Sequence, residues 1–79
     1  MKTLRYNLKS ILDETEISGY RIAQESGIRG NTIADIVNNE AKQVKLENLT
    51  KILNVINTLQ DERHYSIDDI IVYNDDDEH

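Results

Sequence analysis

The stretch SGYRIAQESGIRGNTIADIV, residues 18–37, holds all three glycines of a 79-residue chain that has no proline. Two of them, Gly27 and Gly30, stand three residues apart between segments with the apolar spacing of helices. Ser18 is a favourable N-cap for the first helix, and Gly27 stands directly after it, where a left-handed residue commonly ends a helix. Two short helices joined by a glycine-containing turn predict a helix-turn-helix over about 19–38.

The second helix of this pair is expected to have one buried and one exposed face. It starts near Gly30, and Ile33 and Ile36 share its inner side because they are three residues apart. Ile28, just after the turn, is expected to fill the space between the two helices. The outer side is polar and consists of Asn31, Thr32 and Asp35.

Apolar residues at helical spacing predict two longer helices on either side of the motif. The first runs to about Glu14 and is expected to bury Leu4, Leu8, Ile11 and Leu12. The other covers about 46–58 and is expected to bury Leu46, Leu49, Ile52, Leu53 and Ile56.

The C-terminal part predicts one short helix and then an extended segment. Ser66, with Asp69 three residues later, has the pattern of a capping box for a fifth helix. Residues 71–74 are candidates for an extended segment, and 74–79 are expected to be an acidic, disordered tail. The predicted fold is all-α, with five helices in one domain over 1–73.

The charge of the chain is unevenly distributed. The formal net charge is −6, but residues 1–45 carry seven basic and six acidic side chains, whereas residues 46–79 carry two basic and nine acidic ones. The acidity therefore belongs to the C-terminal part and does not exclude nucleic-acid binding by the rest. No apolar run approaches the roughly 20 residues that span a bilayer. Without cysteine or a signal-like start, the chain is expected to be cytoplasmic.

The residues that most enzymes and metal sites need are scarce. His64 and His79 are the only histidines, and neither has a catalytic or metal-ligating partner at a useful spacing. The acidic end has the composition of a calcium loop but lacks its central glycine and later glutamate. We therefore expect no enzymatic activity, no cofactor and no metal.

Four segments resemble the phage-repressor-type family, also called Cro/CI-like or XRE. They are YRIAQESGI, NTIADIVNN, LENLTKIL and SIDDIIVY, and the resemblance covers roughly residues 5–73. It implies a lambda-repressor-like five-helix domain that binds double-stranded DNA at a specific sequence and regulates transcription, as a phage-like repressor. It also implies that the third helix enters the major groove.

The resemblance assigns candidate DNA contacts residue by residue. The base-reading candidates are Arg29, Asn31, Thr32 and Asp35, whose side chains can address guanine, adenine, thymine and cytosine respectively. The phosphate-contacting candidates are Ser18, Tyr20, Arg21, Gly30, Asn38, Lys42 and Lys45. For each of these side chains the alternative is an ordinary solvated surface residue.

Two positions depart from the family pattern. Arg29 stands where the family usually has a Ser or Thr cap, so either the cap is weak or Asn31 takes its role. Gly30 costs roughly 0.5–1 kcal/mol in a helix relative to alanine. It either allows the backbone to approach a DNA phosphate or belongs to a longer turn.

The expected partners are DNA and a second copy of the chain. A homodimer on a pseudo-palindromic operator would use Val55, Leu59, Ile67, Ile71 and Tyr73, unless the fifth helix simply folds back over them. The alternative function is a protein-interaction module, in which the acidic surface of the scaffold binds another regulator or a polymerase subunit.

Overall fold

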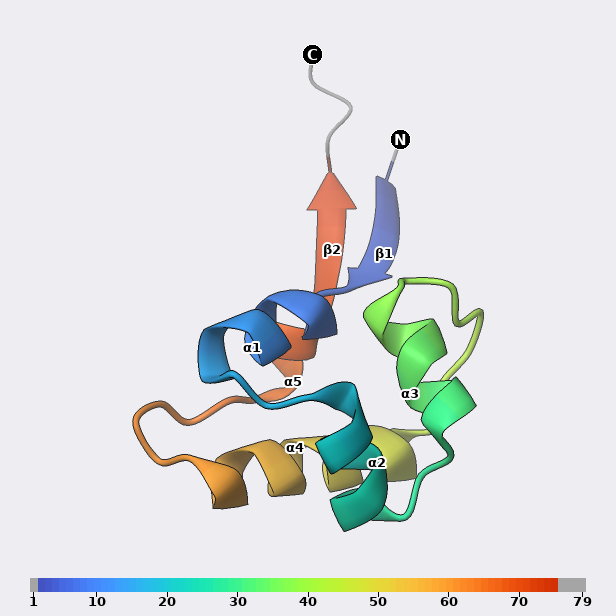
Figure 1. Ribbon diagram of the computed structural model, residues 1–79. Helices are drawn as coiled ribbons and strands as arrows, with labels where there is room; N and C mark the ends of the chain where they lie inside the picture. The colour runs from blue at the N-terminus through green and yellow to red at the C-terminus, as the bar shows by residue number, and fades with distance from the viewer. Residues whose placement is uncertain (1, 76–79) are drawn as a thin grey trace.

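The computed structural model describes residues 2–75 and consists of a small helical domain with a two-stranded ribbon (Figure 1). Its elements in order are β1 (Lys2–Tyr6), α1 (Leu8–Thr15), α2 (Gly19–Ser26), α3 (Gly30–Val37), α4 (Leu46–Leu59), α5 (Ile67–Ile70) and β2 (Ile71–Asp75). The five-helix, helix-turn-helix fold is confirmed, and the extended segment predicted near residue 71 is strand β2.

The helix-turn-helix forms as its sequence predicts. The Ser18 hydroxyl accepts a hydrogen bond of 3.0 Å from the backbone N–H of Arg21 and thereby caps α2. Gly27 ends this helix in the left-handed conformation, with φ of 78°, and its N–H donates to the carbonyl oxygen of Ala23. Ile28 then turns inward and is 8% exposed. Gly27 therefore supplies the left-handed residue with which the turn between α2 and α3 begins.

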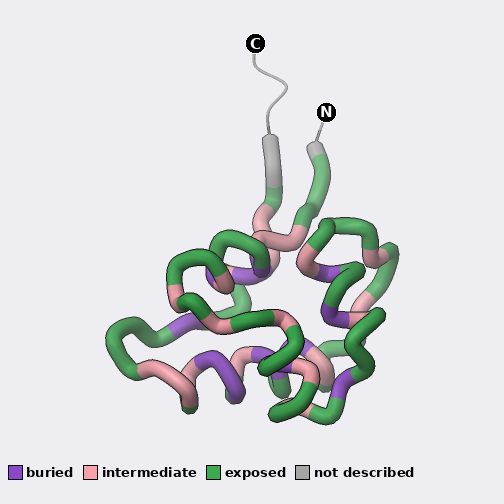
Figure 2. Tube along the Cα trace, viewed as in Figure 1, coloured by how far each residue is buried: buried purple, intermediate pink, exposed green. Residues whose placement is uncertain are grey.

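One apolar core lies between the helices, and Figure 2 shows it as the buried segments that face the interior. Because α3 packs on α2 and α2 on α4, both helices of the motif are held by the rest of the domain. The core consists of Leu8, Ile11, Ile22, Ile28, Ile33, Ile36, Leu49, Ile52, Val55, Ile56, Tyr65 and Ile70.

The first helix begins later than predicted, and the placement of Leu4 in it is wrong. Residues before Asn7 form strand β1, which pairs antiparallel with β2 in a register that sets Leu4 opposite Tyr73. The side chain of Leu4 is 68% exposed. The spacing of Leu4 to Leu8 fits a helix. Residues 2–6 form a strand instead because β2, at the other end of the chain, pairs with them.

The prediction for Leu46 on α4 is also wrong, and the structure decides between two alternatives for Val55. Leu46 was expected in the core but is the first residue of α4 and is 77% exposed, because the core-facing side starts at Leu49. For Val55 the sequence leaves open a dimer surface or burial within the domain, and the side chain is buried, with 9% exposure. Val55 therefore belongs to the core cluster, on a helix that also packs against α2.

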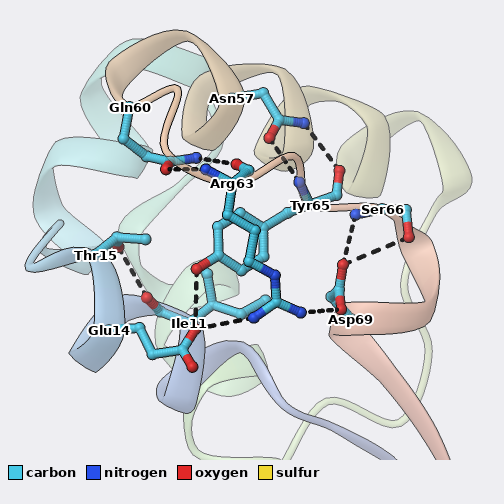
Figure 3. Close-up of polar contacts among 9 residues, drawn as sticks. All are labelled: Ile11, Glu14, Thr15, Asn57, Gln60, Arg63, Tyr65, Ser66 and Asp69. Carbon is cyan, nitrogen blue, oxygen red and sulfur yellow. Dashed lines mark hydrogen bonds and ion pairs between the residues drawn. The ribbon is translucent and has the colours of Figure 1, made fainter.

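Tyr65 fastens the loop between α4 and α5 to two helices (Figure 3). Its hydroxyl donates to Oε1 of Glu14 on α1 at 2.9 Å, and Asn57 on α4 bonds both its backbone N–H and its carbonyl oxygen, each at 2.9 Å. The guanidinium of Arg63 covers the ring at 4.7 Å from its centroid. Burial, followed by the Glu14 hydrogen bond, raises the pKa of the Tyr65 hydroxyl.

The last elements complete the domain. Ser66 and Asp69 form the predicted capping box of α5, and the Ser66 N–H donates to Asp69 Oδ2 at 2.8 Å. Strand β2 continues through Asn74 and Asp75, which pair with Thr3 and Lys2. The rest of the expected acidic tail, residues 76–79, lies outside the described residues. Over the part described, no helix has the length and apolar character needed to traverse a membrane.

Candidate nucleic-acid interface

Helix α3 presents a polar outer face, as its sequence predicts. Its inner residues Ile33 and Ile36 are 2% and 0% exposed. On the outer side Asn31 and Asp35 are exposed, and Thr32 is half-buried. Since the inner face is fixed by the core, the backbone positions of these three candidates are fixed, and the side chains of Asn31 and Asp35 are open to solvent.

The N-terminus of α3 carries no side-chain cap. Arg29 is the N-cap residue, is extended and gives no capping hydrogen bond, as predicted from its chemistry. The helix starts at Gly30, whose φ is not positive, so the alternative of a longer turn is excluded. The first N–H groups of a helix have no partner within the helix and attract anions. This end of α3 is therefore suited to a phosphate.

The start of α2 contributes three candidates that already have partners within the protein. The Ser18 oxygen caps the helix, and the Tyr20 hydroxyl, on a side chain that is 73% exposed, accepts from Gln24 at 3.1 Å. Arg21 pairs with Glu25 at 3.2 Å. A surface pair of this kind contributes at most about 1 kcal/mol, so Arg21 can exchange its partner for a phosphate.

The loop after α3 is held by a Schellman motif. Asn39 is left-handed, with φ of 60°, and its N–H donates to the carbonyl oxygen of Ile36 at 3.1 Å. The N–H of Glu40 donates to the carbonyl oxygen of Asp35 at 2.7 Å. These two bonds satisfy the last carbonyl groups of α3 and fix the direction in which the loop leaves it. Asn38, the C-cap, is exposed on this loop.

The same asparagine joins the end of α3 to the ribbon. Oδ1 of Asn39 accepts a 2.8 Å hydrogen bond from the N–H of Tyr6 on β1. The sequence carries no sign of this contact, because Tyr6 is 33 residues away. Asn39 therefore takes part in both the exit of α3 and the attachment of β1 to the loop after α3.

The basic candidates lie on the opposite side of the domain from the loop between α4 and α5. Arg29, Lys42 and Lys45 are exposed, and within the described side chains none of them has an ion-pair partner. In Figure 1 α3 and the loop that follows it form the right side of the molecule, whereas the α4–α5 loop, which carries Asp61, Glu62 and Arg63, lies at the far left. Net acidity therefore coexists with a mildly basic face.

The described residues contain no group of three or more His, Cys, Asp or Glu side chains placed to hold a metal ion. The chemistry available on the α3 side is that of hydrogen-bond donors, acceptors and positive charges on a fixed helix.

One comparison with known proteins identifies a family. The family model described as "Cro/C1-type HTH DNA-binding domain" matches residues 7–76. No curated protein and no solved structure matches the chain.

Proposed function

Because this chain belongs to the Cro/C1-type helix-turn-helix DNA-binding family, we propose that it is a transcriptional repressor that recognises a specific duplex sequence. The observation that supports this most directly is the polar face of α3, which is exposed beside an uncapped N-terminus and held from behind by buried isoleucines. A recognition helix needs these features: a rigid position, readable side chains and an open end for phosphate.

In this proposal α3 lies in the major groove. Asn31 forms paired hydrogen bonds with an adenine edge, Arg29 addresses guanine, and Thr32 and Asp35 complete the base-reading set. The backbone at Gly30 and the side chains of Ser18, Tyr20, Arg21, Asn38, Lys42 and Lys45 contact phosphates and fix the register of the protein on the duplex.

The test starts with a selection of binding sites from random duplex DNA. Asn31→Ala should then cost about 1–3 kcal/mol on the selected duplex and leave the affinity for a scrambled duplex nearly unchanged. Lys45→Gln is the matched phosphate variant, and it should weaken binding to both duplexes alike. Equal losses on the two duplexes for Asn31→Ala would remove this residue from the base-reading set.

The salt dependence of the same titrations separates the two functional classes. A DNA-binding protein loses affinity steeply as salt rises because cations are released from the phosphates that it neutralises. A protein-interaction module on this scaffold would show no duplex affinity even at low salt.

We also propose that the repressor acts as a homodimer on a pseudo-palindromic site, through the exposed side chains of Leu4 and Tyr73 on the ribbon. Val55 is buried, Leu59 and Ile71 are half-buried, and Ile67 and Tyr73 are 40% and 60% exposed. Leu4 lies directly opposite Tyr73 on the ribbon and is also exposed, so these two side chains form an apolar pair on the surface.

Sedimentation over a range of concentrations tests the dimer. Tyr73→Lys should shift the equilibrium toward the monomer, whereas Ile67→Lys should not if the ribbon forms the interface. A chain that stays monomeric at all concentrations, and on its operator, would refute the proposal.

A further inference from the structure

Strand β1 and the loop after α3 enclose a recess beside the candidate DNA interface. Its volume is about 320 Å³, and Arg5, Tyr6, Asn39 and Lys42 are among the residues that line it. The hydrogen bond from Tyr6 to Asn39 holds its two sides together. The recess is thus tied to the exit of the recognition helix.

The charges around this recess have one sign. Its lining includes the two cations Arg5 and Lys42 and no carboxylate. Both cations are exposed, and among the side chains that the structure describes neither has an acidic partner. Glu40 is on the same loop but does not line the recess. The other lining residues are uncharged, and half of the lining is aliphatic (Leu4, Ala41, Val44 and Ile71), so only the part of the recess formed by Arg5 and Lys42 is complementary to an anion.

The free edge of β1 adds a hydrogen-bond donor. The N–H of Tyr6 points away from β2, because it bonds Asn39. Backbone groups of an antiparallel strand alternate in direction with a period of two residues, so the N–H of Leu4 points from the same edge. Leu4 also lines the recess. An outward N–H beside two cations is a favourable setting for a phosphate oxygen.

We propose that this recess takes the DNA backbone, with Arg5 of β1 on a phosphate next to that of Lys42. The inference rests on the proposed function and extends the DNA interface from the helix-turn-helix to the ribbon. Lys42 connects the two parts, since it belongs to the loop that follows α3 and also lines the recess. The sequence alone placed Arg5 in a helix and gave it no role.

The test measures the salt dependence of duplex binding for the full chain. The slope of log affinity against log salt is negative, and Arg5→Gln should make it less steep by about one. This change corresponds to about eightfold weaker binding at 0.1 M salt. The loss should be equal on selected and scrambled duplexes. Arg5→Lys keeps the charge and should restore the slope.

Lys9→Gln is the control, because it removes the same charge from an exposed lysine that pairs with Asp13 on α1. If Arg5→Gln changes the slope no more than this control does, the inference is wrong. It is also wrong if Arg5→Gln changes only the monomer–dimer equilibrium in the absence of DNA, since the occupant is then a second copy. A wild-type chain without salt-dependent duplex affinity would instead refute the proposed function itself.

Discussion

Gly27, in the turn, and Gly30, at the start of α3, should respond to the same substitution in opposite directions. Gly30 is the first residue of α3, its φ is not positive, and a Cβ placed on it meets no atom within 4 Å. Gly30→Ala should therefore stabilise the domain by about 0.4–1 kcal/mol, chiefly by reducing the entropy of the unfolded chain. For a domain of this size the midpoint of thermal unfolding should rise by roughly 2–8 °C.

Gly27 is the matched control. A Cβ there also meets nothing within 4 Å, but φ is 78°. The left-handed conformation costs a residue other than glycine about 1–2 kcal/mol, which exceeds the entropic gain. Gly27→Ala should therefore lower the unfolding midpoint by several degrees, by about 4–8 °C per kcal/mol lost.

Thermal unfolding followed by circular dichroism measures both variants, and duplex titration measures their binding. If the backbone at Gly30 approaches a phosphate, Gly30→Ala should be more stable than the wild type and yet bind DNA more weakly. A lower midpoint for Gly30→Ala would refute the assignment of Gly30 to the helix. Equal shifts of the same sign for both variants would refute the distinction drawn from φ.

Further substitutions at four positions test the contacts and backbone conformations that hold the domain. Tyr65→Phe should lower the free energy of unfolding in urea by about 1 kcal/mol, and Glu14→Gln should add little once that hydroxyl is gone. The pKa of Tyr65 is raised above its ordinary 10.0, so the protonated hydroxyl contributes its full stabilisation of the fold below pH 10. That stabilisation is lost as the pH rises through the raised pKa, so alkaline titration should destabilise the wild type more than Tyr65→Phe. Asn39→Gly, which keeps the left-handed backbone but loses the bond to Tyr6, should cost less stability than Asn39→Ala in the same assay. Glu16 ends α1 in the left-handed conformation, with φ of 61°, which is unfavourable for a residue other than glycine. Glu16→Gly should therefore leave the urea midpoint unchanged or raise it slightly. A clear fall in the midpoint would contradict backbone strain at Glu16.

The parts of the fold that local sequence controls were predictable. Ser18, Gly27 and the isoleucines of α3 act through neighbours within a few residues, so caps, turn and helix faces follow from spacing. The polar face of α3 was predictable for the same reason, because its direction is set once Ile33 and Ile36 are buried.

The parts that depend on distant residues were not predictable. Leu4 fits a helix by its spacing and becomes part of a strand because β2 pairs with it from the other end of the chain. The apolar spacing along α4 does not by itself place Val55 in the core, but Val55 is buried in the assembled domain. The recess lined by Arg5 needs the ribbon, the loop and the bond between them, and no single segment contains this information.

The pairing of β1 with β2 also determines how the molecule should respond to force. Lys2 pairs with Asp75, and the two strands leave the domain side by side in Figure 1. Tension applied through these two residues acts across the ladder, so residue pairs separate one after another from the outer end, as in a zipper. The ribbon resists with one pair at a time and opens before the helices carry any load. A pulling experiment would therefore register two separate events, first the peeling of the ribbon and then the rupture of the helical core.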